Sequence, residues 1–326
     1  MKAIVWTDYG PPDVLQLQEV EKPVPNDNEV LIKVYATTVT AGDCELRNLD
    51  FSFVLRTIFR LSFGLKKPKR VKILGMELAG IIEAVGKNVK LFKKGDHVFG
   101  STGMRFGAYA EYACLPEEWN EGALAIKPVN ITFEEAATVP IGCLEAYYFL
   151  EKANVKTGDN VLILGASGTI GTVAIQLVKY FGAKVTAVGN PNSLDVMKSI
   201  GADKTMDYTK DDFMDSQEKY DVIFDVVGKY SFSDCKKALK KKGMLLLANP
   251  KLSTIVRGLL SSIKVKTGST SYTKERLSFL KNLIEMGELK PVIVKQYSLE
   301  EIPEAHKFVE EGQKVGDISI TIEPNH

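Results

Sequence analysis

The sequence predicts an α/β protein with a strand-rich domain and a second domain built on a doubly wound parallel sheet. Short apolar segments separated by turn signals occupy residues 1–130, and strand and helix patterns alternate over residues 131–269. Alternation of this kind is typical of a parallel sheet covered by helices on both faces. Residues 270–326 close with the alternating segment DISITIE, which we expect at the edge of the strand-rich domain with one face exposed.

The individual elements follow from apolar runs bounded by Gly, Pro, Asn and Asp clusters. In the strand-rich domain we expect strands at KAIVW, EVLIKVYAT, ELAGIIEAVG and DHVFGS. In the second domain the expected strands are VLIL, KVTAV, KTMDY, YDVIFDVV and MLLLA, with helices between them. After residue 270 we expect helices at KERLSFLKNLIEMG and EIPEAHKFVEEG and a strand at PVIVKQY.

The stretch VLILGASGTIG carries the clearest functional signal. Gly165, Gly168 and Gly171 follow an apolar strand and open a helical pattern that leads to a second strand. In this context the first glycine permits a tight turn, the second lets the backbone approach a pyrophosphate, and the third lets the helix pack on the strand. The helix N-terminus offers N–H groups to phosphate. We therefore predict that a dinucleotide is bound by Gly165, Ser167, Gly168, Thr169, Ile170 and Gly171.

Composition argues against several classes of function. Lys and Arg number 42 and Asp and Glu 41, so there is no global field that would attract nucleic acid. No apolar run approaches the roughly 20 residues that span a bilayer, and the N-terminus carries no signal peptide pattern. The four cysteines are far apart without CxxC spacing, which favours reduced thiols. We expect a cytoplasmic protein with neither a nucleic-acid nor a membrane partner.

Residues 51–72 are apolar and basic and contain no acid. Such a stretch is compatible with a helix on a membrane surface, but it is short and Pro68 closes it. We expect a lid or wall over an apolar substrate pocket instead, with ordinary core packing as the alternative.

A set of motifs runs along the whole chain: EVLIKVYATTVTAGD, GMELAGIIEAVG, FKKGDHVFG, GAYAEY, EEAATVPIGCLEAYYFL, GASGTIG, IGADKTMDY and FDVVG. In this set the sequence resembles the medium-chain dehydrogenase/reductase superfamily, and within it the zinc-free quinone oxidoreductase-like branch. The resemblance implies a GroES-like, β-rich catalytic domain over residues 1–130 and 270–326, interrupted by a Rossmann NAD(P)-binding domain over residues 131–269. It also implies a cofactor in the cleft between the domains and a homodimer.

The resemblance bears on metal binding through two positions. Zinc-dependent members have Cys ahead of an Asp in the first motif and His in a G-H-E motif. Here those places hold Thr40, three residues before Asp43, and Met76. A hydroxyl and a thioether do not replace thiolate and imidazole on Zn²⁺. His97, His306 and His326 form no cluster in the sequence, so we expect neither a catalytic nor a structural zinc.

Without a metal, the substrate must already be electron-poor. A quinone or the β-carbon of an enone accepts hydride with modest hydrogen bonding to the developing oxyanion. Thr40 is the candidate donor. A second candidate is Glu145, at the place where the family usually has Thr in G-L-T-A. Its carboxyl could repel an oxyanion or donate a proton if burial raised its pKa, and it could equally face solvent or pair with a lysine.

The residues expected around the cofactor ribose favour NADPH, with NADH as the alternative. The second strand ends at Gly189 and Asn190, without the acid that binds a ribose 2′-hydroxyl in NAD enzymes. Asn190, Ser193 and Tyr208 are expected to hydrogen-bond a 2′-phosphate, although Asn192 and Ser193 stand where related enzymes usually place Lys or Arg. By resemblance, Val227 and Asn249 border the cofactor.

The predicted function is an NADPH-dependent reductase of a small quinone or enone. Two alternatives remain open: a zinc-dependent alcohol dehydrogenase, and a non-catalytic NADPH-binding protein.

Overall fold

The computed structural model describes residues 1–214, 217–250, 252–268, 270, 272–312 and 314–322. The chain divides into two compact units. The first comprises Met1–Pro140, Ser271–Glu285 and Ile293–His326, and the second comprises Ile141–Thr270 and Met286–Val292.

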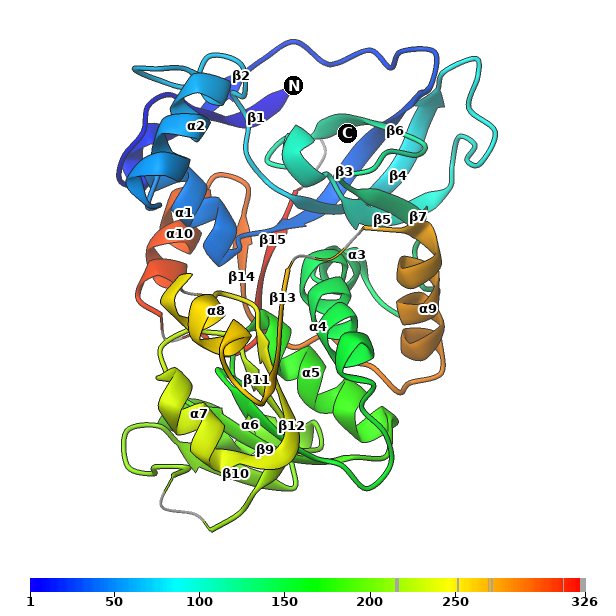
Figure 1. The fold of residues 1–326 in the computed structure, drawn as a ribbon. Coiled ribbons are helices and arrows are strands. Elements are labelled where there is room, and N and C mark those ends of the chain that lie inside the picture. The colour runs from blue at the N-terminus through cyan, green and yellow to red at the C-terminus, as the bar shows by residue number, and fades with distance from the viewer. Residues whose placement is uncertain (215–216, 251, 269, 271, 313, 323–326) are drawn as a thin grey trace. The chain divides into compact units, whose positions relative to one another are not determined.

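The first unit is the strand-rich one. In chain order its elements are β1 (Lys2–Trp6), η1 (Pro12–Val14), β2 (Leu15–Glu19), β3 (Glu29–Thr38), α1 (Ala41–Asn48), α2 (Phe53–Phe63), β4 (Glu77–Val85), β5 (His97–Ser101), η2 (Gly103–Arg105), β6 (Tyr112–Pro116), β7 (Ala123–Ile126), α3 (Phe133–Ala137), α9 (Lys274–Glu285), β14 (Ile293–Ser298), α10 (Ile302–Glu310) and β15 (Asp317–Thr321) (Figure 1).

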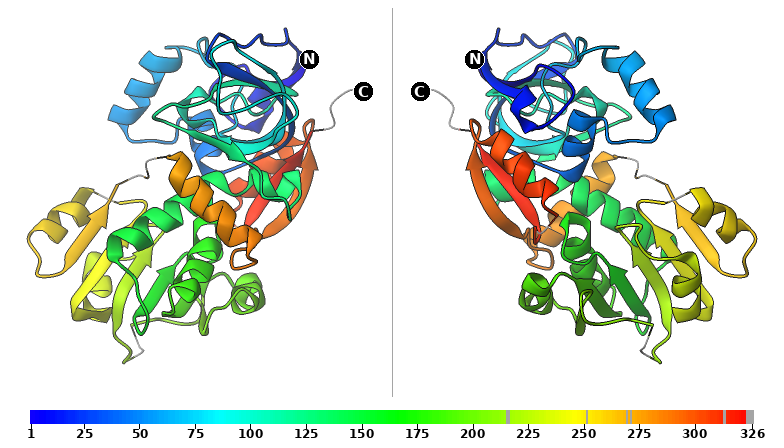
Figure 2. Two further views of the ribbon diagram at one scale, coloured as in Figure 1. Left: turned by 90° about the vertical axis from the view of Figure 1, so that its right-hand side faces the viewer. Right: turned by 90° about the vertical axis from the view of Figure 1, so that its left-hand side faces the viewer.

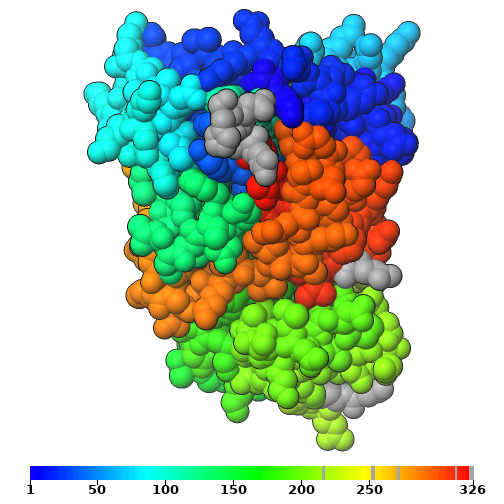
Figure 3. All heavy atoms as spheres, turned by 180° about the vertical axis from the view of Figure 1, so that it is seen from behind, coloured from blue at the N-terminus to red at the C-terminus, as the bar shows by residue number. Residues whose placement is uncertain are grey.

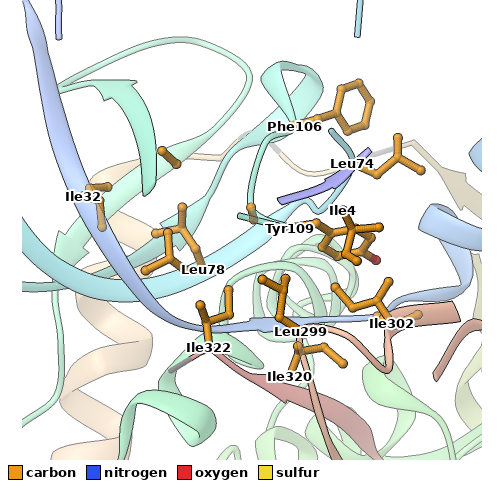
Figure 4. Close-up of a cluster of buried hydrophobic side chains, with 14 of the residues drawn as sticks. Ile4, Ile32, Leu74, Leu78, Phe106, Tyr109, Leu299, Ile302, Ile320 and Ile322 are labelled. Atoms are coloured by element: carbon orange, nitrogen blue, oxygen red, sulfur yellow. The ribbon is translucent and has the colours of Figure 1, made fainter. Parts of the chain in front are cut away.

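A seven-stranded sheet organises this unit, in the order β14-β15-β3-β4-β5-β7, with β6 also paired to β3. Strand β3 pairs antiparallel with β4, β6 and β15, so it joins the start of the chain to its end. The apolar side chains of these strands form one core, and Figure 4 shows Ile4, Ile32 and Leu78 in it together with Ile320 and Ile322 from the C-terminal segment. The C-terminal segment is therefore part of the strand-rich unit, as its pattern predicts.

The place of the closing strand differs from our expectation. β15 lies between β14 and β3 rather than at the edge, and Ile318, Ser319 and Ile320 are all buried. The edge position belongs to β14, which is seen at the surface as an orange segment in Figure 3. The alternation of Ile with Ser and Thr was misleading because small hydroxyl side chains fit a covered face as well as an exposed one.

The second unit contains α4 (Pro140–Ala153), β8 (Asn160–Leu164), α5 (Thr169–Tyr180), β9 (Lys184–Gly189), η3 (Pro191–Ser193), α6 (Leu194–Ser199), β10 (Lys204–Asp207), β11 (Tyr220–Asp225), α7 (Phe232–Ala238), β12 (Leu239–Leu247), α8 (Leu252–Leu259) and β13 (Lys264–Thr267). Its six strands are all parallel, in the order β10-β9-β8-β11-β12-β13.

Numbered within this sheet, the strand order is 3-2-1-4-5-6, that of a doubly wound dinucleotide-binding fold. The five strands that the sequence predicts are all present. The sixth, β13, was missed because Lys264 and Lys266 break its apolar character at the end of the sheet. The order reverses between β8 and β11, and ligands of such sheets bind outside the carboxyl ends of the strands at this point.

The unit boundaries have local causes. Residues 131–140 belong to the strand-rich unit because α3 packs on its sheet, beginning at a capping box in which Thr132 and Glu135 satisfy each other's backbone N–H groups. Residues 286–292 belong to the second unit, where the Gln176 side chain pairs with both backbone groups of Lys290, at 3.0 and 2.8 Å.

Candidate functional site

The turn after β8 is shaped by its glycines. Gly165 adopts φ +84°, which favours glycine, and its N–H and that of Ala166 both donate to the Val188 carbonyl, at 3.1 and 2.8 Å. These two bonds tie the turn to the end of β9. Gly168 then caps α5 in an extended conformation, and the Thr172 N–H donates to its carbonyl at 2.9 Å.

Gly168 and Gly171 differ in the space around them. A Cβ added to Gly171 would lie 2.4 Å from the Gly165 carbonyl oxygen and 2.5 Å from Ala166 Cα, so the helix lies against the turn because Gly171 has no side chain. A Cβ on Gly168 would meet only the Gly165 carbonyl oxygen, at 3.8 Å. The backbone of the turn is thus open at Gly168, where the first turn of α5 directs its N–H groups. Half-buried Ser167, Thr169 and Ile170 flank it.

The other predicted cofactor residues follow neighbouring strands. Gly189 ends β9 and Asn190 follows it, Tyr208 follows β10, Val227 follows β11 and Asn249 follows β12. Because the strands are parallel, all of these positions lie at the carboxyl edge of one sheet, together with the glycine turn. The side chains of Tyr208, Val227 and Asn249 are exposed there.

Ser193 is arranged differently from our expectation for it. Its hydroxyl donates to the Asn190 carbonyl at 2.6 Å and the residue has no exposed surface. Gly189 is also enclosed, since an added Cβ would lie 2.7 Å from Ser193 Oγ and 2.9 Å from Met197. Ser193 therefore holds the end of β9 against α6. Of the three residues expected at the 2′-phosphate, Asn190 and Ser193 are buried and Tyr208 is exposed.

Thr40 and Asp43 are joined at the start of α1 in the first unit. Thr40 caps the helix: its Oγ1 accepts from the Asp43 N–H at 3.2 Å and donates to Asp43 Oδ2 at 2.6 Å, and the same carboxylate oxygen accepts from the Thr40 N–H at 3.0 Å. Thr40 is half-buried and Asp43 is fully buried. Burial raises the pKa of Asp43 to about 6, against the opposing effect of the Thr40 hydrogen bonds.

A buried polar cluster continues behind this pair. The Tyr109 hydroxyl lies 3.2 Å from His306 Nε2, and Cys44 Sγ lies 3.3 Å from His306 Nδ1. Burial lowers the pKa of His306 to about 3, with the neighbouring Arg47 charge acting in the same direction. Burial also raises the pKa of the Cys44 thiol and of the Tyr109 phenol. His306 is therefore neutral, and Arg47 is paired with Glu310.

Sequence reasoning did not find this cluster. The T-x-x-D spacing of Thr40 and Asp43 is a capping-box pattern and could have indicated their contact. No local signal connects Cys44, Tyr109 and His306, which come from three distant segments of the chain.

Glu145 lies in α4, half-buried in the second unit. Its Oε1 accepts from the Thr270 backbone N–H at 3.3 Å, and burial raises the pKa of its carboxyl although that hydrogen bond lowers it. The sequence left four arrangements open for this carboxyl and did not indicate the backbone donor that the structure places beside it.

Known proteins resemble this chain over its whole length. Residues 26–126 match the alcohol dehydrogenase GroES-like domain family, and residues 200–318 match the zinc-binding dehydrogenase family. The 2-methylene-furan-3-one reductase of Solanum lycopersicum is 33% identical over 332 residues, which cover 98% of this chain and 79% of that protein. The chain belongs to the quinone oxidoreductase-like branch of the medium-chain dehydrogenase/reductase superfamily.

Two further members give the same result. The NADPH-dependent alkenal/one oxidoreductase of Arabidopsis thaliana is 30% identical over 334 residues, covering 98% of this chain and 79% of that protein. The quinone oxidoreductase structure from Coxiella burnetii superposes with a TM-score of 0.88 at 27% identity, covering 99% of each chain. The predicted combination of a GroES-like unit with a Rossmann unit is thereby confirmed.

One of the two matching domain families is named for zinc binding, but the side chains of this chain differ from a set of zinc ligands. Protein ligands to zinc are the side chains of Cys, His, Asp and Glu. Thr40 and Met76 belong to none of these residue types. Cys44 has its sulfur against His306 in the core, and His326 lies outside the described residues. Across the described part of the chain no three or more metal-binding side chains are grouped to hold an ion. The described residues do not fit a zinc site.

No helix in the described part of the chain combines the length and apolar character needed to cross a membrane.

Proposed function

We propose that this protein is an NADPH-dependent reductase that delivers a hydride to a quinone or an α,β-unsaturated carbonyl compound without a metal. The observation that carries the proposal is the open glycine turn at the switch point of a sheet ordered 3-2-1-4-5-6. The names of its relatives, an enone reductase and an alkenal/one oxidoreductase that depends on NADPH, support the choice of substrate class and cofactor.

The residues of the second unit fit a dinucleotide. The open side of Gly168 leaves room for a pyrophosphate at the N-terminus of α5, whose N–H groups and dipole favour an anion. When bound, NADPH supplies the hydride. Val227 and Asn249 would border the riboses, and Tyr208 would hydrogen-bond the 2′-phosphate. The missing acid at the end of β9 removes the repulsion that a carboxylate would exert on that phosphate.

We assign the proton-donating role to Thr40 with Asp43 behind it. While Asp43 is ionised, the one hydroxyl hydrogen of Thr40 is committed to its carboxylate. A protonated Asp43 instead donates to Thr40 Oγ1, and the Thr40 hydrogen becomes available to an enolate or hydroquinone oxygen on the substrate. The proton that the substrate gains from Thr40 is replaced by the proton of Asp43, which returns to the carboxylate form. Glu145 is the second candidate for this role.

The test measures NADPH consumption with benzoquinone and with an alkenal, before and after exhaustive chelation, together with elemental analysis for zinc. The proposal requires turnover that survives chelation and no stoichiometric zinc. Alcohol oxidation that disappears on chelation and returns with Zn²⁺ would identify a zinc-dependent alcohol dehydrogenase instead. Tight NADPH binding without turnover of any quinone or enone would identify a non-catalytic binding protein.

We further propose a homodimer in the cytoplasm. The four free cysteines, Cys44, Cys114, Cys143 and Cys235, suit a reducing compartment. Sedimentation of the purified protein would measure the oligomeric state, and a monomer at all concentrations would contradict it.

A further inference from the structure

Helix α2 is anchored to the first unit by one face. Phe59 and Phe63 stack with ring centroids 5.5 Å apart, and Phe63 contacts Trp6 and Phe106 edge-on at 5.9 and 5.8 Å. Ordinary core packing therefore accounts for this side of the helix. In a surface helix of this kind the opposite face is normally polar.

The opposite face of α2 is apolar and exposed. Val54, Ile58 and Leu61 follow one another at helical spacing, with 66%, 50% and 60% of their surface exposed. Leu65, one further turn along and just past the helix, is 66% exposed. Figure 2 shows α2 as a light-blue helix at the margin of its unit. We call these four side chains, each at least half exposed, the apolar stripe of α2.

Positive charge follows this stripe along the chain. Between Phe51 and Met76 there is no Asp or Glu. Arg56 and Arg60 face the packed side of α2, where they contact the Leu49 carbonyl and the Tyr9 ring. Five further cations come directly after the stripe: Lys66, Lys67, Lys69, Arg70 and Lys72. The net charge of the whole chain is only +1, so the remainder of the protein is negatively charged. Lys67, Lys69 and Lys72 also line a surface hollow of about 990 Å³, to which Arg105 adds a further cation and Glu21 one acid.

We propose that the apolar stripe of α2 and the cations of residues 66–72 dock the protein on an anionic lipid bilayer. The stripe would lie at the boundary between headgroups and acyl chains, and the cations would face lipid phosphates, since amphipathic helices bind by this combination of apolar burial and attraction to anionic lipid. The sequence led us to expect no membrane partner. The outward direction of the stripe, which the sequence does not show, changes that expectation.

The charge decides between the possible occupants. A second copy of the chain would bring the same five cations to a two-fold interface, where they would repel. A neutral quinone would satisfy part of the stripe but none of the cations. An anionic bilayer matches both, and the negative remainder of the protein would orient this segment toward it.

The experiment is co-sedimentation with vesicles of phosphatidylcholine alone and of phosphatidylcholine mixed equally with phosphatidylglycerol. We expect at least about tenfold stronger partition to the anionic vesicles, lost at high salt. Ile58→Asp should abolish it. Val129→Asp is the matched control, because Val129 is 86% exposed in the loop between β7 and α3, which contributes no residue to the hollow, and it should leave partition unchanged. Equal thermal unfolding of both variants excludes a folding defect.

Three results would overturn the proposal. One is equal partition to neutral and anionic vesicles. Another is that the protein binds neither kind of vesicle and that Ile58→Asp raises the KM for the quinone. The stripe would then be a lid over the substrate. The third is that the protein binds no vesicles and that Ile58→Asp dissociates a dimer. The stripe would then be a contact between two copies of the chain.

Discussion

The hydroxyl of Thr40 donates its single hydrogen to Oδ2 of Asp43 across 2.6 Å and accepts the Asp43 backbone N–H in return. A hydroxyl held in this way cannot donate to a substrate unless the carboxyl first takes up a proton. The burial that raises the pKa of Asp43 to about 6 brings that event close to neutral pH.

We therefore predict that turnover with an enone rises as the pH falls through about 6, because protonated Asp43 frees the hydrogen of Thr40. Asp43→Asn supplies a permanent amide donor to Thr40 and should remove this pH dependence. Thr40→Val should lower kcat about tenfold at acidic pH, since one hydrogen bond gained in the transition state is worth about 1.4 kcal/mol. The measurement is kcat against pH for the three proteins. An Asp43→Asn profile that still follows the original one would exclude the relay.

The glycine turn gives a matched pair of variants. Gly168→Asp places its side chain in open space with a negative charge at the N-terminus of α5, so we expect a folded protein whose Kd for NADPH rises at least about a hundredfold. Gly171→Ala drives its methyl group against the Gly165 carbonyl oxygen, so we expect a lower Tm. Calorimetric titration and thermal unfolding measure the two effects. Unchanged NADPH affinity in Gly168→Asp would remove the phosphate-binding assignment.

The sequence predicted the parts of this fold that depend on local pattern. Strand β8, the glycine turn and α5 follow from neighbouring residues, and so did the contrast between a strand-rich and an alternating region. The position of β15 between two strands could not be predicted, because pairing partners far apart in the chain decide it. The same holds for the contact of Cys44 and Tyr109 with His306, and for the burial of Ser193, which depends on how η3 folds under β9.

The enclosure of Gly189 changes how cofactor preference should be tested. From the sequence, Gly189→Asp would be expected to favour NADH, but its new side chain would collide with Ser193 and Met197 and disturb the strand end itself. Tyr208 is exposed at the same edge and offers a cleaner variant. We predict that Tyr208→Phe raises the Kd for NADPH about tenfold, because a hydrogen bond to a charged phosphate is worth about 1.5–3 kcal/mol.

The affinity for NADH, which has no 2′-phosphate, should not change in Tyr208→Phe. Fluorescence titration with each cofactor measures the two constants side by side. A parallel loss for both cofactors would mean that Tyr208 supports the loop rather than the phosphate, and tighter binding of NADH by the unmodified protein would contradict the preference for NADPH.

The last prediction concerns stability, and its sign follows from His306. Burial lowers the pKa of this side chain to about 3, below its unfolded value of about 6.5, so between these pH values the unfolded chain takes up a proton that the folded chain does not. The free energy of unfolding should therefore fall with falling pH, by up to about 1.4 kcal/mol per pH unit from this group alone. Asp43 acts in the opposite direction, since its raised pKa adds stability as the pH falls toward 4. Because Asp43 is present in every protein compared, its contribution cancels in the difference between two proteins.

His306→Gln should remove the His306 contribution to this slope while it leaves that of Asp43. The measurement is urea unfolding at several pH values between 7 and about 4.5, below which the unfolded His is fully charged. We expect the free-energy difference between the original protein and the variant to shrink steadily as the pH is lowered, whatever its size at neutral pH. Ile302→Val is the control, because Ile302 is buried in the same helix, α10, and carries no titratable group, so the slope of this variant should match that of the original protein. A constant difference between the original protein and His306→Gln across this range would show that His306 takes up its proton in the folded state.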